Sequence, residues 1–321
     1  MALPITALLG LLSLAVSPAR PLPAPAREPH FLFDLATSTG TSESTWASLA
    51  YDRQHDELFA IHGGQVHVFN QAGMETYTFG GNGDLGSVER VALFESGEML
   101  LLANVNGRRT IVRCDYRGEP IGPFEVKPIP EEFAGFDPDR ILVQGGKVYL
   151  VATASMRVLV ADGQGMVEQA YDLASMVRAK DPEIKAGMNG FWADAQGNFV
   201  FTMPYAFTAF AMSPSRELRQ FGTRGSSPGK FNIVGAVATD EQGNLFVLDR
   251  LRSVVLVFNP SLKFVLEFGY RGEGPTNLIA PYDLSVGNGK VFVSQARDRG
   301  VKVFQYDPSD LTIPPAGAAG G

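Results

Sequence analysis

Cysteine is nearly absent from the sequence: Cys114 is the single one among 321 residues. One cysteine cannot form an internal disulfide, and without partners it cannot hold a structural zinc ion. It lies in the strand-like run 110–115, and no histidine lies near it in the sequence. We therefore expect Cys114 to be a buried structural side chain, and the fold to be held without a covalent cross-link.

A basic excess is also missing. The chain has 27 Lys and Arg against 34 Asp and Glu, which gives a formal net charge of −7. Proteins that bind duplex nucleic acid usually carry a basic surface, because they neutralise phosphates. The charge balance therefore predicts that nucleic acid is not a partner.

The apolar run near the N-terminus, Leu8–Val16, is too short to cross a bilayer. A Pro-rich stretch follows it, with an A-x-A cleavage motif at Ala24–Ala26 and an alternative at Ser17–Ala19. This arrangement predicts a signal peptide over residues 1–26. No cysteine follows the run to carry a lipid. We therefore predict a secreted or periplasmic protein with no stable membrane anchor after the signal is removed.

The sequence does contain a repeat. Its clearest unit starts at Phe231, turns at Asp240–Asn244, and continues with strand-like runs at Leu245–Leu248, Val254–Phe258 and Phe264–Phe268. Apolar residues occupy both alternating positions of Val254–Phe258, which is typical of a strand buried on both faces. Sheets that stack against one another on both sides need such strands.

The second strand of this unit recurs six times, with starts separated by 41 to 51 residues. The six starts are Leu58, Met99, Val148, Phe199, Leu245 and Val291. Repeats of this length form four-stranded sheets in β-propellers. We predict an all-β fold over residues 27–307: a six-bladed β-propeller of four-stranded antiparallel blades.

The two ends of the repeat region lead to two further predictions. The last unit shows three strands, and the run His30–Leu35 stands alone before the first unit. We predict that this run completes the sixth blade as its outer strand and closes the ring, which removes exposed sheet edges. The Pro-, Gly- and Ala-rich residues 308–321 are predicted to be a disordered tail.

The repeat resembles the NHL repeat. The residues that carry the resemblance are Phe221-Gly-Thr-Arg-Gly225, Gly229-Lys-Phe231, Asp240, Gly243-Asn-Leu-Phe-Val247, Asp249, Arg252 and Phe258. The unit from Phe268-Gly-Tyr-Arg-Gly272 to Phe304 is similar, and the third unit departs most, with Gln144-Gly-Gly-Lys147 in place of the Asp turn. The resemblance implies a propeller of the exported bacterial type that binds ligands on one face. It implies no single chemistry, because such propellers include protein-binding modules, RNA binders, lyases and lactonases.

Two interblade connections are longer than the others. The Pro-rich segment Glu125–Asp137 is expected to be a surface loop. The segment Asp172–Lys180 is predicted to be a helix capped by Asp172. Such a connection either packs against the blade edges or covers the channel, and we favour packing.

Ligand-binding candidates come from the loops at one face. With the units aligned on their second strands, the residues at the entrances to the inner strands include Arg90, Arg140, Asn189 and Asp283. They predict either a mouth at which arginine forks bind a carboxylate or phosphate, or an Arg–Asp network that fills a polar channel. Three further arginines add positive charge to the same face: Arg108, Arg250 and Arg297.

A second set of arginines comes just before the third strands: Arg109, Arg157, Arg252 and Arg299. An arginine at this position matches the NHL pattern. Because these residues recur at one position of the repeat, we predict a structural role, in which each clamps a neighbouring loop carbonyl or an aspartate such as Asp249 or Asp298.

A metal site has little support in the sequence. The four histidines all lie in the first quarter of the chain, at His30, His55, His62 and His67, so histidines from several blades cannot converge on a metal. Oxygen ligands that could bind calcium are Asn104, Asn189, Asp194 and Asp283. We find no nucleophile motif, phosphate-binding glycine loop or informatively spaced carboxylate pair.

The leading hypothesis is a non-catalytic binding or scaffold protein of the cell envelope or secreted space, without a cofactor. Its ligand would be a peptide, a protein or an anionic glycan, bound at the loop-rich, arginine-bearing face. The alternative is a calcium-dependent hydrolase or lyase, lactonase-like or amidating-lyase-like, with its site at the channel mouth. Three or more oxygens within reach of one metal ion would favour the enzyme, whereas arginines and apolar residues would favour binding.

Overall fold

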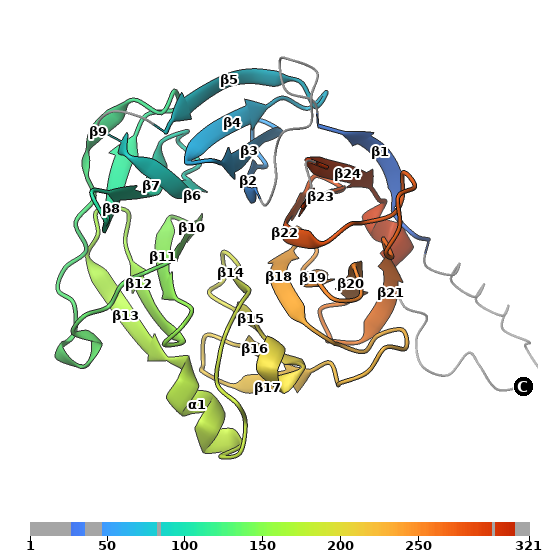
Figure 1. Cartoon of the computed structure of the whole chain (residues 1–321). Coiled ribbons are helices and arrows are strands. Elements are labelled where there is room, and N and C mark those ends of the chain that lie inside the picture. Colours follow the sequence, from blue (N-terminus) through green and yellow to red (C-terminus); the bar gives the residue numbers. More distant parts are fainter. Residues whose placement is uncertain (1–26, 36–46, 82–84, 297–298, 312–321) are drawn as a thin grey trace, which may run out of the picture.

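The computed structural model describes residues 27–35, 47–81, 85–296 and 299–311. These residues form six four-stranded antiparallel sheets that surround a common axis (Figure 1). The predicted six-bladed β-propeller is therefore confirmed. The predicted signal peptide, Arg297 and most of the predicted tail lie outside the described residues.

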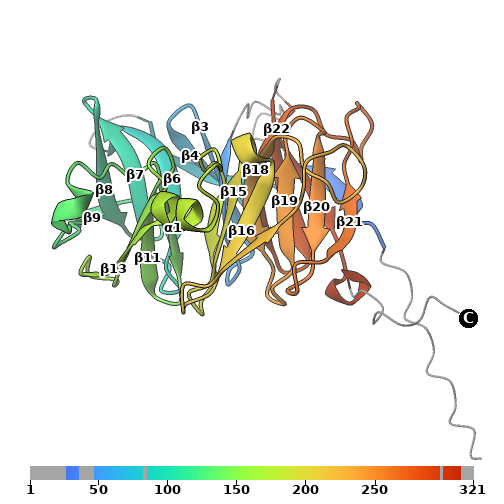
Figure 2. The same cartoon turned by 90° about the horizontal axis from the view of Figure 1, so that it is seen from below.

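Each blade runs from an inner strand at the axis to an outer strand at the rim (Figures 1 and 2). Blade 1 consists of β2 (Ser48–Asp52), β3 (Glu57–His62), β4 (Gln65–Phe69) and β5 (Glu75–Gly80). Blade 2 consists of β6 (Ser87–Leu93), β7 (Met99–Val105), β8 (Arg108–Cys114) and β9 (Pro120–Pro123). Blade 3 consists of β10 (Arg140–Gln144), β11 (Lys147–Ala152), β12 (Arg157–Ala161) and β13 (Val167–Asp172).

The remaining blades follow in chain order around the ring. Blade 4 consists of β14 (Phe191–Ala193), β15 (Phe199–Met203), β16 (Thr208–Met212) and β17 (Leu218–Phe221). Blade 5 consists of β18 (Val234–Thr239), β19 (Leu245–Asp249), β20 (Val254–Phe258) and β21 (Phe264–Phe268). Blade 6 consists of β22 (Pro281–Gly287), β23 (Lys290–Gln295), β24 (Val301–Gln305) and, at its outer edge, β1 (His30–Asp34).

Blade 5 shows why apolar residues occupy both faces of the middle strands. Every residue of β19 and β20 is buried, because neighbouring blades cover both sides of the sheet. Between blades 4 and 5 the rings of Phe221, Phe231 and Phe258 meet edge to face, with centroids 5.2 to 6.0 Å apart. Edge-to-face pairs of this kind stabilise a core beyond their buried area.

The repeated Asp turns connect inner and second strands by side-chain hydrogen bonds. The Asp240 carboxylate accepts hydrogen bonds from the backbone N–H groups of Gln242 and Asn244, at 3.0 and 2.8 Å. Gly243 adopts a φ of 79°, in the left-handed region that favours glycine. Asp194 makes the same turn in blade 4. The turn chemistry predicted from the repeat is therefore present.

Both ends of the described chain join blade 6. Strand β1 pairs antiparallel with β24, and the Phe31 ring meets that of Phe304 at 6.3 Å between centroids. After β24 the chain forms a short 3-10 helix, Pro308–Leu311, whose Leu311 is buried in the core. The prediction of a disordered tail from residue 308 was wrong for these four residues, because Leu311 adds apolar area to a core that also contains Leu266 and Phe268.

The long connections pack against the ring. The helix α1 (Leu173–Lys180) begins where predicted, with the Asp172 carboxylate accepting the N–H of Ser175 at 2.9 Å. Its buried face covers blades 3 and 4 at the rim, away from the channel (Figures 1 and 2). The loop 125–137 holds Phe133 in the core of blades 2 and 3. Among the described helices, none is long and apolar enough to cross a membrane.

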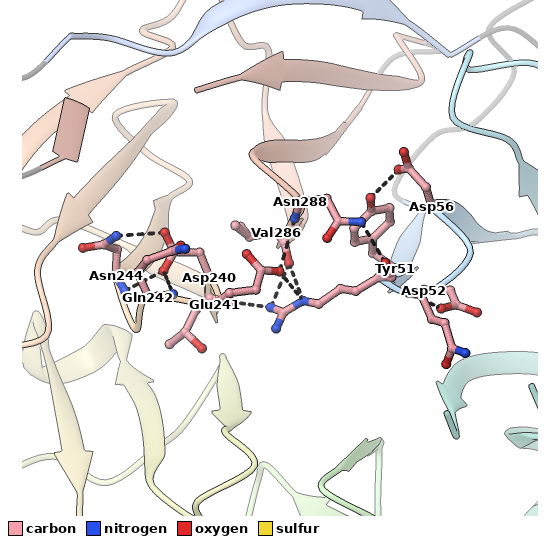
Figure 3. A network of polar contacts seen from close by, with 12 residues as sticks. Tyr51, Asp52, Asp56, Asp240, Glu241, Gln242, Asn244, Val286 and Asn288 are labelled. Carbon is pink, nitrogen blue, oxygen red and sulfur yellow. Dashed lines mark hydrogen bonds and ion pairs between the residues drawn. The ribbon is translucent and has the colours of Figure 1, made fainter. Parts of the chain in front are cut away.

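A polar network joins blade 1 to blades 5 and 6 at one face of the ring (Figure 3). Arg53, in the β2–β3 turn, donates hydrogen bonds to the carbonyls of Val286 and Thr239. It also pairs with Glu241 at 3.2 Å, and its guanidinium lies 5.6 Å from the centre of the Trp192 ring. One side chain thus connects three blades and rests on a fourth.

We expect Arg53→Ala to lower the free energy of unfolding by about 2 kcal/mol, because hydrogen bonds from a charged donor contribute about 1.5–3 kcal/mol and water replaces part of this loss. Urea denaturation followed by circular dichroism measures the change. The exposed neighbour Gln54 supplies the control, since Gln54→Ala should leave stability within about 0.5 kcal/mol. Equal effects of the two substitutions would show that the network does not hold the blades together.

Candidate functional site

The inner strands of all six blades line a central channel. The part between the strands has a volume of about 110 Å³, and its wall combines apolar side chains with Arg90, Arg140 and Asp283. On the face that carries the β3–β4 turn it widens into a hollow of about 460 Å³, which we call the mouth. The mouth is lined by Ser48, Ile61, Gly63, Gly64, Val88, Glu89, Arg90, Arg109, Asp139, Arg140, Thr153, Asn189 and Tyr282. The Arg53 network lies at the opposite end of the channel, beside a hollow of about 620 Å³.

Arg90 comes from β6, directly after a bulge in its pairing with β7. Its guanidinium donates hydrogen bonds to the Ser48 hydroxyl of blade 1 and, at 2.8 Å, to the carbonyl of Glu89. Within the described part of the chain its Nε is buried without a partner. Arg90 therefore ties two blades together and still has an unused donor.

Arg140 begins β10 and lies beside Arg90 in the mouth and at the channel wall. Among the described residues, its guanidinium forms neither a hydrogen bond nor an ion pair. Burial lowers the pKa of Arg140, and the charge of Arg90 lowers it further, whereas Asp283 and Asp139 act in the opposite direction. An arginine nevertheless stays protonated at neutral pH, so a half-buried cation with five donors lines the mouth.

The carboxylates near Arg140 are engaged elsewhere. Asp283 accepts the backbone N–H groups of Leu49 at 3.2 Å and of Leu284 at 3.0 Å. Asp139 accepts the N–H of Thr153 at 3.1 Å and also its hydroxyl.

The third carboxylate, Glu89, pairs with Arg109 at 2.8 Å. Within the described residues, none of these three carboxylates forms an ion pair with Arg90 or Arg140. The hypothesis of an Arg–Asp network that fills the channel therefore does not match the geometry.

The structure brings together four of the predicted site residues and separates the others. Asn189 lines the mouth with Arg90 and Arg140, and Asp283 lies just below them at the channel wall. Arg250 lies outside the mouth, with its guanidinium 5.2 Å from the centre of the Tyr282 ring. Arg108 is exposed at the start of β8 and does not line the mouth. Arg297 lies outside the described residues.

The second arginine set contacts loops, as predicted. Arg252 donates to the loop carbonyl of Lys230 at 2.8 Å, which is one of the two predicted kinds of partner. Its ion pair is with Glu267 and not with Asp249, and Asp298 lies outside the described residues. Asp249 instead accepts backbone N–H groups, including that of Leu251 at 3.1 Å. Of the other members, Arg109 pairs with Glu89 and Asp137, Arg157 lies over Phe133, and Arg299 pairs with Glu273.

Sequence reasoning missed two features of the mouth. Tyr282 lines the mouth, and the guanidinium of Arg250 lies over its ring. The repeat pattern does not indicate a site residue at this position. Arg109 was assigned only a structural role, yet it lines the mouth as well. Both could have been considered as site residues from the sequence, because Tyr282 precedes the candidate Asp283 and Arg109 follows the candidate Arg108.

The four candidate calcium ligands do not converge. Asp194 belongs to a turn on the opposite face from Asn189, and its carboxylate accepts three hydrogen bonds within that turn. Asn104 accepts the N–H of Gly107 in its own hairpin. Across the described residues, no three His, Cys, Asp or Glu side chains lie close enough together to hold one metal ion.

We expect calcium at millimolar concentration to leave the melting temperature of the protein unchanged, because the candidate oxygen ligands lie on two faces of the ring. A thermal shift measurement with and without a chelator checks this. Magnesium at the same concentration controls for general salt effects. A calcium-specific rise of several degrees would favour a calcium-dependent hydrolase or lyase over a binding protein.

Comparison with known proteins shows a shared fold. No family model matches the chain, and no curated protein matches it. A protein of unknown function from Bacteroides thetaiotaomicron superposes with a TM-score of 0.62 at 11% identity, covering 88% of this chain and 83% of that one. Virginiamycin B lyase from Staphylococcus aureus gives 0.52 at 12%, covering 87% and 89%.

A gluconolactonase from Xanthomonas campestris gives a TM-score of 0.51 at 14% identity, covering 90% of this chain and 99% of that one. These proteins are similar to the chain in architecture, and their low identities show the propeller fold alone. The resemblance to NHL repeats stays a prediction.

Proposed function

We propose that this propeller is a non-catalytic binding protein that holds an anionic group, such as a carboxylate, at its mouth. The observation that carries the proposal is the guanidinium of Arg140, which lines the mouth and lacks an acceptor among the described residues. Arg140 is half-buried, and a guanidinium that is partly removed from water costs free energy when no acceptor faces it. A carboxylate would supply two acceptor oxygens in the planar geometry that arginine fits best.

The mouth is rich in donors rather than strongly positive. Arg90, Arg109 and Arg140 are matched in formal charge by three nearby carboxylates: Glu89, Asp139 and Asp283. Those carboxylates already accept hydrogen bonds, whereas Arg140 and the buried Nε of Arg90 donate none. This imbalance supports recognition by hydrogen-bond geometry more than by long-range attraction.

The ligand that fits such a site is a peptide, a protein segment or an anionic glycan. The predicted signal peptide supports a place in the periplasm or outside the cell. The resemblance of blades 5 and 6 to NHL repeats supports a binding role as well, because that resemblance implies ligand binding on one face.

Titration with citrate tests the proposal, since three carboxylates are the main recognition groups of citrate, beside one hydroxyl. Citrate at one hundred times its dissociation constant should increase the free energy of unfolding by about 2.7 kcal/mol. This stabilisation is detected as a rise in the melting temperature. Sodium chloride at equal ionic strength is the control. If chloride stabilises the protein as much as citrate does, the mouth has no preference for carboxylates and the proposal fails.

A further inference from the structure

A second hollow lies next to the mouth on the loop-rich face. It has a volume of about 300 Å³ and lies between the β19–β20 loop and the segment that leads from β21 into β22. Its lining consists of Arg250, Leu251, Ser253, Arg271, Gly272, Glu273, Ile279 and Ala280. Arginines and aliphatic side chains thus share one small concave surface.

The hollow and the mouth share a wall. The guanidinium of Arg250 lies 5.2 Å from the centre of the Tyr282 ring. Arg250 lines the hollow, and Tyr282 lines the mouth. A ligand that extends from the mouth across Tyr282 therefore reaches the hollow directly.

The charges of the hollow favour an acidic group. Arg271 is exposed, and it forms no ion pair among the described residues. The one carboxylate of the lining, Glu273, faces Arg299 at 3.6 Å. Arg250 and Arg271 thus border the hollow, and its acidic side chain, Glu273, pairs with Arg299.

Apolar side chains around the hollow favour a peptide over a sugar. Leu251 is 59% exposed and Ile279 is half-buried. Ile233, 42% exposed, lies next to Arg250, whose N–H its carbonyl accepts. Exposed aliphatic residues between arginines are typical of protein contacts. A glycan uronate would satisfy the arginines and leave the aliphatic side chains in water.

We infer that the ligand is an acidic peptide segment with two acidic side chains and an apolar residue between them. One acidic side chain binds Arg140 in the mouth, the apolar residue covers Leu251, and the second acidic side chain binds Arg271 in the hollow. This inference rests on the proposed function of the mouth. It adds the class of ligand and a second subsite.

The probes are acetylated, amidated peptides with two glutamates, one leucine between them, and zero to three glycines as spacers. Each is paired with a partner peptide whose second glutamate is glutamine. At the best spacing, the two-glutamate peptide should bind about tenfold tighter than its glutamine partner peptide, because it gains one charged hydrogen-bonded contact. Isothermal titration calorimetry measures both affinities. Digalacturonate serves as the glycan probe and should bind more weakly than this peptide.

Arg271→Gln should remove the tenfold gain and leave the affinity for the one-glutamate peptide unchanged. The matched control is Arg224→Gln, because Arg224 occupies the same position in the preceding interblade loop and does not line the hollow. Leu251→Ser should weaken the binding of the two-glutamate peptide and leave the affinity for citrate unchanged.

Three results would overturn the inference. A gain that survives Arg271→Gln would remove the second subsite but leave the proposed mouth intact. Tighter binding of digalacturonate than of any peptide would replace the peptide with a glycan. If neither citrate nor any peptide binds, the proposed function of the mouth fails together with the inference.

Discussion

Arg252→Ala is expected to lower the free energy of unfolding by about 3–5 kcal/mol, since removing one partner of a buried ion pair leaves the other charge uncompensated. The side chain of Arg252 is 10% exposed and that of its partner Glu267 is 3% exposed. Glu267 also accepts the N–H of Gly229 at 3.2 Å, so the pair connects β21 to the loop that enters blade 5. For a chain of this size, such a loss lowers the melting temperature by roughly 10 °C.

Urea denaturation of the wild type and the variant measures this effect. Arg117→Ala is the control, because Arg117 is an exposed arginine in the β8–β9 turn that lies over Tyr116. Its loss should change stability by about 0.5 kcal/mol or less. Replacing both Arg252 and Glu267 by leucine should restore much of the stability, as apolar substitutes for buried ion pairs often do. A change below about 1 kcal/mol in Arg252→Ala would contradict a structural role for this pair.

Arg140→Gln should weaken citrate binding by about 10- to 100-fold, which corresponds to the loss of about 1.5–3 kcal/mol from a charged hydrogen bond. The same substitution should leave the protein folded, because Arg140 donates no hydrogen bond within the described structure. Its removal also relieves the repulsion from Arg90. Calorimetric titration gives the affinity, and the unfolding curve gives the stability of the same sample.

Two other arginines make this experiment selective. Arg90→Gln should weaken binding and also reduce stability, because Arg90 holds Ser48 of the neighbouring blade. Arg108→Gln removes the same charge from an exposed position on the same face and should leave binding unchanged. Equal losses of affinity in Arg108→Gln and Arg140→Gln would show that citrate responds to the charge of the face and not to the mouth.

The architecture could be predicted from the sequence because its determinants are local. The alternating apolar residues of Val254–Phe258 indicate a strand covered on both faces, and the structure buries all five. The turn at Asp240–Asn244 forms through hydrogen bonds within five residues. A signal that is contained in one hairpin and repeated six times is visible without knowing the fold.

The details of the site depend on contacts between residues far apart in the sequence. Asp283 and Arg140 were predicted to meet, yet Asp283 is held by the backbone N–H of Leu49, 234 residues away. Asp194 was grouped with Asn189, although the strand between them places the two on opposite faces of the ring. Alignment of repeats gives the position of a residue along its blade, but the acceptor of each side chain is set by the neighbouring blade.

The composition of the C-terminal end misled the prediction. The Pro-, Gly- and Ala-rich stretch suggested disorder from residue 308, whereas residues 308–311 are ordered by local contacts. Leu311 is buried in the same core as Phe268 and Leu266, which fixes the preceding residues as a short helix. One buried aliphatic side chain contributes roughly 1.5–3 kcal/mol. The hydrogen bonds that Asp307 accepts from Ser309 and from the N–H of Asp310 add to this contribution and help to order the short helix.

A crystal structure of the protein with citrate tests the mouth most directly. We expect a carboxylate of citrate within hydrogen-bond distance of the Arg140 guanidinium, with Asp283 still bound to the N–H of Leu49. An Arg140 that forms an ion pair with Asp283, with citrate absent from the mouth or bound elsewhere, would contradict this expectation.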